Sequence, residues 1–227
     1  MNVDDALAAL RAHADPEKAA GMASYHKVDR EYLGLSNAIT GDLATQWRKE
    51  AADQAALVAL AQGLWDTDIF EARIAAGKLF LQARMRPDDT LAWGWITSVV
   101  PQFDSWAIAD AVAQSAQKRL VQDPSRLDLL EEWTQSEHLW TRRSAFVFTL
   151  SFVKSRHPSA TEKAARDRVL NWAAALAQDP EWFIQKAIAW WLRDLSKRDQ
   201  DAARIWLEHH GDRLKPFAAK EAARYLP

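Results

Sequence analysis

Helical periodicity is the sequence feature that most restricts the fold of this chain. Long segments rich in Ala, Leu and Trp repeat their apolar residues with a period near 3.6, and no alternating run indicates a strand. Glycine occurs only seven times in 227 residues, so few positions favour a break in these segments. The sequence therefore predicts an all-α fold.

Three Asp-Pro pairs mark expected helix starts, because Asp caps a helix and proline suits its first position. They are Asp15-Pro16, Asp123-Pro124 and Asp179-Pro180. Together with the apolar periodicity they predict about twelve helices with short linkers. The expected ranges are 3–13, 16–28, 40–62, 66–84, 88–99, 105–121, 125–135, 137–155, 159–177, 180–197, 199–210 and 216–225. We expect one domain over residues 1–227.

A weak repeat appears when the expected helix starts are aligned. The aligned aromatic and basic pairs are Phe70 with Arg73, Trp140 with Arg143, and Phe183 with Lys186. Trp106 falls between the first two pairs and gives spacings of 36, 34 and 43 residues. Such a period is typical of stacked helix pairs, so we expect a HEAT-like solenoid with a concave inner face. The repeat is broken at Ala109, where the other helices have a cation, and Asp110 follows.

Composition limits the compartment and the chemistry. The chain has no cysteine, which excludes disulfides and thiolate chemistry and fits a cytoplasmic protein. Its first residues are acidic and helical, unlike a signal peptide, and its longest mostly apolar run, 144–153, is too short to cross a membrane.

Charge is distributed unevenly over a chain whose net charge is −2. Residues 1–139 hold 13 Lys and Arg against 21 Asp and Glu, whereas residues 140–198 hold 11 against 5. This asymmetry indicates one basic surface, although a set of unrelated solvated helix faces would give the same count.

The segment 104–112 predicts two helix turns with two different faces. Asp104 is the expected N-cap, and Ile108 and Val112 form an apolar side. Trp106 and Asp110 stack four residues apart on another face. That face continues through small and polar residues, Ala113 and Gln117, which suits an open surface. An aromatic ring beside a carboxylate suits a cationic intermediate, and a Trp packed on a neighbouring helix beside a solvated Asp is the plainer alternative.

The expected helix after Asp179 also separates into two stripes. Its core stripe is Ile184, Ile188, Trp191 and Leu195. A second stripe is Lys186, Trp190 and Arg193, whose alternation of cation, indole and cation suits a nucleic-acid backbone. The alternative is a half-buried Trp flanked by two solvated side chains.

Arg143 occupies an apolar stripe in the expected helix 137–155, so it needs a carboxylate or phosphate partner. A structural salt bridge and a phosphate contact both satisfy this need. Arg142 falls on the polar side and is expected to be solvated. The sequence has no glycine-rich phosphate loop, no nucleophile elbow and no metal-ligand pattern among its six histidines, so no metal or cofactor is expected.

Four segments resemble the bacterial DNA alkylation-repair glycosylases built from HEAT-like repeats, the AlkD type. They are residues 104–112, the run 138–148, the run 182–193 that includes Phe-Ile-Gln-Lys-Ala-Ile, and the run 16–25 followed by Tyr32-Leu-Gly-Leu35. The resemblance covers nearly the whole chain.

The resemblance implies roles only at matching positions. It places the family's carboxylate at Asp110, its two active-site Trp residues at Trp106 and Trp190, and its active-site Arg at Arg143. Tyr25 matches a residue near the lesion more weakly. Lys186 and Arg193 would add contacts to the DNA backbone. Ala107 and the charged segment 26–31 depart from the usual pattern, which puts DNA contacts near 26–31 in doubt.

We therefore expect a monomeric DNA glycosylase that removes positively charged N3- or N7-alkylated purines from duplex DNA, without cofactor or membrane. None of the six histidines is expected on the faces of Trp106, Arg143 or Trp190. The alternative is a non-catalytic helical-repeat module that binds DNA or a protein.

Overall fold

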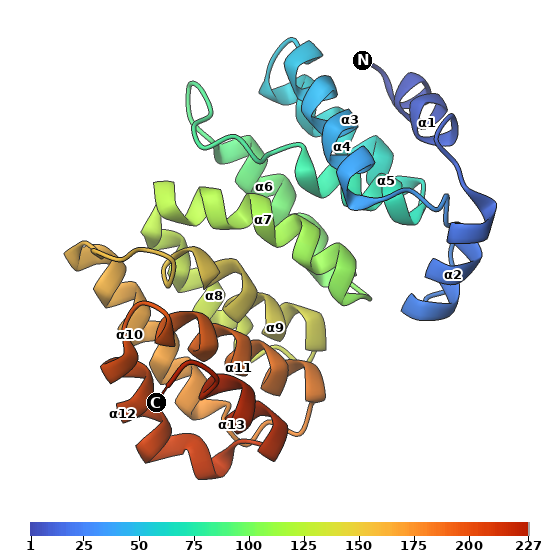
Figure 1. Cartoon of the computed structure of the whole chain (residues 1–227). Coiled ribbons are helices and arrows are strands. Elements are labelled where there is room, and N and C mark those ends of the chain that lie inside the picture. Colours follow the sequence, from blue (N-terminus) through green and yellow to red (C-terminus); the bar gives the residue numbers. More distant parts are fainter. Residues whose placement is uncertain (227) are drawn as a thin grey trace. The chain divides into compact units, whose positions relative to one another are not determined.

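The computed structural model describes residues 1–226. Every regular element in this part of the chain is helical (Figure 1). The α-helices are α1 (Val3–Arg11), α2 (Pro16–His26), α3 (Asn37–Glu50), α4 (Gln54–Asp66), α5 (Phe70–Lys78), α6 (Thr90–Val99), α7 (Trp106–Gln122), α8 (Leu127–Trp133), α9 (Leu139–Val147), α10 (Ala160–Ala175), α11 (Trp182–Ser196), α12 (Gln200–His210) and α13 (Pro216–Ala222). Short 3₁₀ turns are η1 (Val100–Gln102), η2 (Pro124–Arg126), η3 (Phe148–Ser151) and η4 (Gly211–Arg213). The chain divides into two compact units, Met1–Arg119 and Leu120–Pro227.

The first unit is built around a layer in which α5 packs against α3 and α4, and α1 covers the same helices (Figure 1). Its core contains the completely buried indoles of Trp47 and Trp65. Burying aromatic rings of this size is among the largest apolar contributions a side chain can make to stability. In contrast, α2 has no buried residue and lies at the margin of the unit.

The second unit is organised on α11, which packs against α9, α12 and α13 (Figure 1). The buried side of α11 carries Ile184, Ile188, Trp191 and Leu195, all at most 1% exposed. These are the four residues of the predicted core stripe, so that prediction is confirmed.

The aligned helix starts are also confirmed. Phe70 and Trp106 are the first residues of α5 and α7, and Trp140 and Phe183 are the second residues of α9 and α11. The aligned positions therefore open every second helix, as a helical-repeat fold requires.

Several helix boundaries were predicted wrongly. The expected helix 40–62 is two helices, because Ala51 is extended and the Asp53 side chain caps α4 by accepting from the Ala56 amide. Only residues 70–78 of the expected 66–84 are α-helical, and 137–155 shortens to α9 and the turn η3.

The Asp-Pro pairs have three different outcomes. Asp15 caps α2 through the Lys18 amide, as predicted. Asp123 caps the 3₁₀ turn η2 instead of an α-helix. Asp179 accepts hydrogen bonds from Glu181 and Arg142, and α11 begins only at Trp182.

Within residues 1–226, no helix is long and apolar enough to cross a membrane. The same residues contain no group of three or more His, Cys, Asp or Glu placed to hold a metal ion.

Candidate functional site

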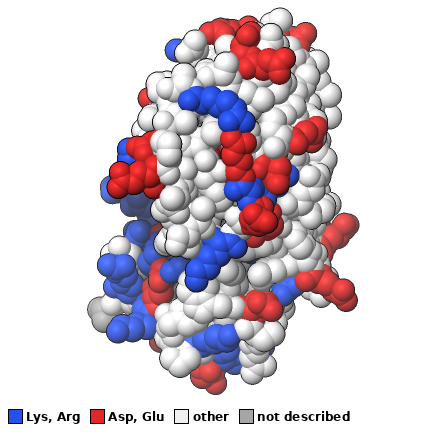
Figure 2. Space-filling view, turned by 90° about the vertical axis from the view of Figure 1, so that its right-hand side faces the viewer, with Lys and Arg blue, Asp and Glu red and all other residues white. Residues whose placement is uncertain are grey.

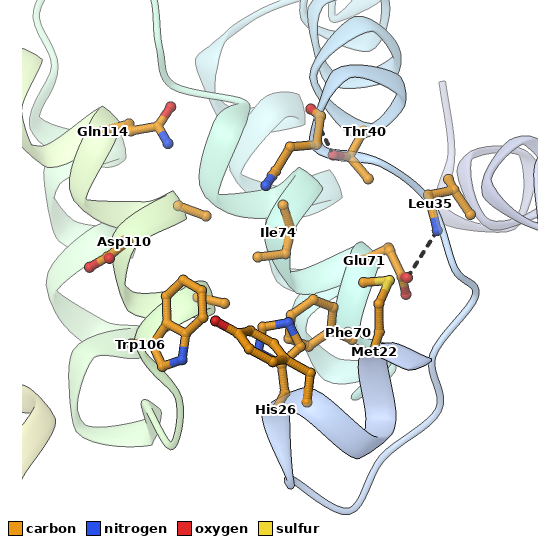
Figure 3. A pocket seen from close by; sticks show the side chains of 14 residues that line it. Met22, His26, Leu35, Thr40, Phe70, Glu71, Ile74, Trp106, Asp110 and Gln114 are labelled. Carbon is orange, nitrogen blue, oxygen red and sulfur yellow. Dashed lines mark hydrogen bonds between the residues drawn. The ribbon is translucent and has the colours of Figure 1, made fainter. Parts of the chain in front are cut away.

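A pocket of about 190 Å³ in the first unit contains three of the predicted site residues, Tyr25, Trp106 and Asp110. Its walls come from α2, α3, α5 and α7 (Figure 3). Along α7, Trp106, Asp110 and Gln114 follow one another on the wall that faces Phe70 and Ile74 of α5 (Figure 3). The sequence thus placed Trp106 and Asp110 correctly on one face of one helix.

The start of α7 is fixed differently from the prediction. The helix begins at Trp106, and the hydroxyl of Ser105 accepts a hydrogen bond from the Ile108 amide (3.5 Å). Asp104 is therefore not the N-cap. Its carboxylate is bound instead by Arg30, whose side chain is 3% exposed. This ion pair ties the start of α7 to the connection between α2 and α3.

A close helix contact sets the rotation of α7. A Cβ added at Gly77 of α5 would lie 2.9 Å from Val112, and the Ser115 hydroxyl donates to the Gly77 carbonyl at 2.6 Å. Because the apolar side of α7 turns this far toward α5, Ala113 is completely buried. The prediction that Ala113 continues the open face is wrong, and Gln114 continues it instead.

An aromatic cluster closes one side of the pocket. The ring of Tyr25 meets Trp106 edge to face, with centroids 6.0 Å apart. The imidazole of His26 lies 5.3 Å from the Trp106 ring and 4.6 Å from Phe70. His26 was not expected on the Trp106 face, so the prediction that no histidine lies there is wrong. Burial lowers the pKa of His26, partly offset by the charge of Glu71, so the ring is neutral at neutral pH.

A buried carboxylate organises the connection between α2 and α3. Glu71, 1% exposed, accepts hydrogen bonds from the amides of Leu33 (2.9 Å), Gly34 (2.8 Å) and Leu35 (3.2 Å). Gly34 has a φ of +82°, and a Cβ there would lie 2.2 Å from the Asp15 carbonyl oxygen. Glycine is therefore required for α2 to approach this connection. The result is a fixed position for the helix that carries Tyr25 and His26.

Lys78 supports the opposite wall from behind. Its ammonium group, on a residue 6% exposed, donates to the carbonyl and Oδ1 of Asn37 and to the hydroxyl of Thr40, at 2.7–3.3 Å. Burial lowers the pKa of this amine. Because lysine only donates, the Asn37 amide must turn its oxygen toward Lys78, which leaves its NH₂ group for another partner.

The predicted stripe of α11 lies as expected, but its charges are already paired. Trp191 is 1% exposed, whereas Trp190 is half-buried and its Nε1–H donates to Asp194 at 3.1 Å. Glu221 of α13 binds Arg193 at 2.5 Å and approaches Lys186 at 3.6 Å. The sequence gave no indication of Glu221, because α13 is separated from α11 by another helix.

The two arginines of α9 are both held by protein groups. Arg142 donates to Asp179 (2.9 Å) and to the Ser136 carbonyl (2.6 Å), so the prediction that it is solvated is wrong. Arg143 is 4% exposed, and its guanidinium lies 5.8 Å from the centre of the Trp140 ring. This burial agrees with the need for a partner that its apolar stripe predicted.

The model of the DNA alkylation repair enzyme family matches residues 6–226, which span both units. The chain belongs to this family. A comparison with curated proteins gave no match.

Solved structures with the same fold include members of this repair family. A predicted DNA alkylation repair enzyme from Enterococcus faecalis is 25% identical, with a TM-score of 0.79 over 94% of this chain and 97% of that one. AlkD2 from Streptococcus mutans is 18% identical, with a TM-score of 0.62 over 92% and 98%. The protein smu.31 from Streptococcus mutans UA159 is 19% identical, with a TM-score of 0.59 over 84% and 99%.

The charge count of this repair-family chain overstates its basic surface. Several cations of residues 140–198 contact carboxylates or buried carbonyls: Arg142, Arg166, Arg168, Lys186, Arg193 and Lys197. On the face shown in Figure 2, Lys and Arg gather toward the lower left edge and are interspersed with Asp and Glu elsewhere. The net charge of a segment therefore does not equal the charge that it presents to DNA.

Proposed function

We propose that this member of the DNA alkylation repair enzyme family is a DNA glycosylase that releases N3- or N7-alkylated purines from duplex DNA. The observation that carries the proposal is the placement of the Asp110 carboxylate one helical turn from the Trp106 ring, on the wall of a pocket. A negative group beside an aromatic face stabilises developing positive charge.

The proposed reaction begins with a base that already carries a positive charge. When the bond from C1′ to the base nitrogen breaks, its electron pair neutralises the base and leaves an oxocarbenium-like sugar. Asp110 stabilises this cation and orients a water, whose oxygen bonds to C1′ while its proton is released. Trp106 offers a ring face to the sugar, and Tyr25 lies near the lesion.

In the second unit, Arg143 is proposed to contact a phosphate, Trp190 to contact the sugar, and Lys186 and Arg193 to contact the backbone. Lys186 and Arg193 must exchange Glu221 for phosphate when DNA binds. A structural role for buried Arg143 is the alternative.

The mechanism supplies no acid for the departing base. His26 is the histidine of the pocket, and its lowered pKa makes it a poor proton donor at neutral pH. Neutral bases need protonation or strong hydrogen bonding to leave, so we expect no release of hypoxanthine or uracil.

The test is a time course with duplexes that carry 7-methylguanine, hypoxanthine or uracil at one position, scored for free base and for abasic sites. Release of 7-methylguanine alone is the expected result. Comparable release of a neutral base would contradict the electrostatic mechanism. Binding to the duplex without release of any base would identify the protein as a non-catalytic DNA-binding module.

A further inference from the structure

The pocket beside Trp106 and Asp110 has the size of a small planar ligand. Its volume of about 190 Å³ is below the ~300 Å³ at which pockets for drug-sized ligands begin. A sugar with two phosphates would exceed it, whereas one nucleobase is of matching size. Four rings (Tyr25, His26, Phe70 and Trp106) line the same space and can stack on a flat heterocycle.

Polar groups in the wall have no partner within residues 1–226. Nδ1 of His26 is buried and makes no hydrogen bond. The side-chain amide of Gln114 makes none either, and Asn37 uses its Oδ1 for Lys78 but not its NH₂. Buried polar groups without partners cost free energy, so their presence indicates a ligand that satisfies them.

The charge of the wall excludes an anion as that ligand. Asp110 and Glu71 both line the pocket, while the ammonium of Lys78 is directed to Asn37 and Thr40. A phosphate would be repelled, whereas a neutral or cationic heterocycle would be attracted by the carboxylate and by the ring faces.

We propose that this pocket binds an N-alkylated purine base, a choice of ligand that rests on the proposed glycosylase function. Trp106 and His26 stack on the base, and the amides of Gln114 and Asn37 read its polar edge. The ligand has two sources with the same chemistry, a base still attached to its sugar and a base already released.

Calorimetric titration of the full chain tests the site without DNA. Three probes separate the sources: 7-methylguanosine, which is cationic, 7-methylguanine, which is the released base, and guanosine, which lacks the alkyl group. We expect at least one alkylated probe to bind more tightly than guanosine. Binding of 7-methylguanosine alone places the base in the pocket before bond cleavage, and binding of 7-methylguanine alone places it there afterwards.

Two variants assign the binding to this pocket. Gln114→Leu and His26→Phe keep the side-chain size and remove one polar contact each, so each should weaken binding of the alkylated probe by about three- to tenfold. Gln122→Leu, exposed on the same helix and outside the pocket wall, should leave it unchanged. Thermal melting of each variant reports whether the fold is retained.

No binding of either alkylated probe would overturn the proposal, as would affinities unchanged by both pocket variants. The excision time course on the same preparations separates this failure from failure of the proposed function. Excision without base binding removes the pocket assignment only, and base binding without excision removes the glycosylase assignment only.

Discussion

The pocket wall on α7 and the polar stripe of α11 carry the same kinds of residue in opposite states. On α7, Trp106 and Asp110 share a wall with polar groups that have no partner, such as the Gln114 amide. On α11, the indole of Trp190 and the cation of Arg193 already have carboxylate partners. An aromatic and charged pattern in a sequence therefore indicates a face, while the tertiary partners decide whether that face is available to a ligand.

The largest expected effect is on the α7 side. Asp110→Asn keeps the size of the side chain and removes its charge, so excision of 7-methylguanine should fall by a factor of ~10² or more. Duplex binding should hold or tighten, because a negative charge leaves the DNA-facing site. Asp4→Asn, an exposed position on α1, is the matched control. Excision near the wild-type rate would show that the carboxylate does not stabilise the sugar.

The next prediction tests the two faces of α11. Trp191→Ala removes a fully buried indole and should lower the free energy of unfolding by ~3–5 kcal/mol. Trp190→Ala removes a half-buried ring and should reduce excision before it reduces stability. Chemical denaturation and single-turnover excision measure the two effects, and the reverse assignment would mean that the functional face of α11 is the other one.

Arg143 distinguishes a DNA contact from a structural one. If it binds a phosphate, Arg143→Ala should weaken duplex binding and reduce the slope of log K against log salt by ~0.9. If its role is structural, the melting temperature should fall and the slope should stay unchanged. Arg142→Ala is the control, because the Asp179 pair already accounts for that side chain.

The outcome for Arg142 shows what the sequence could not supply. Periodicity predicted the helices, the aligned starts of every second helix, and the separate faces of Trp190 and Trp191, because each depends on residues within one helix. The carboxylates that bind Arg142 and Arg193, and the position of His26 against Trp106, depend on residues brought together from different helices. Helix ends failed where a local cap such as Asp53 interrupted an otherwise continuous apolar period.

The signals for the missed pocket residues were present but weak. Phe70 stood in the aligned repeat, directly before Glu71. The Tyr32-Leu-Gly-Leu35 run contains a glycine whose positive φ requires a stabilised turn, but the sequence does not say which carboxylate holds that turn.

A prediction of smaller effect concerns the pairing on α11. Glu221→Gln frees Lys186 and Arg193, and an exposed ion pair contributes only ~0.2–1 kcal/mol, so stability should change little. Duplex affinity should rise and its salt slope should steepen by up to ~0.9 for each cation that gains a phosphate. Glu208→Gln, which loses an exposed pair with Arg204, should change neither quantity. Unchanged affinity in Glu221→Gln would remove α11 from the DNA-binding surface.

The smallest expected effect is the pH response of the pocket. Because burial lowers the pKa of His26 in the folded state, the unfolded chain binds the proton more readily. The stabilisation is complete above the unfolded pKa of ~6.5 and is lost as the pH falls toward the folded pKa. Denaturation at a series of pH values should show this loss in the wild type, less of it in His26→Phe, and all of it in His157→Gln. Equal losses in all three proteins would assign the response to other groups.

The three amide hydrogens held by Glu71 offer a way to follow the pocket in the absence of any nucleic acid. Leu33, Gly34 and Leu35 all donate to one carboxylate, and α2, which carries Tyr25 and His26, has no buried residue of its own. Local opening of this connection would release all three amides at once. Their hydrogen–deuterium exchange should therefore occur as a group, and its rate would report how often the aromatic wall leaves Trp106.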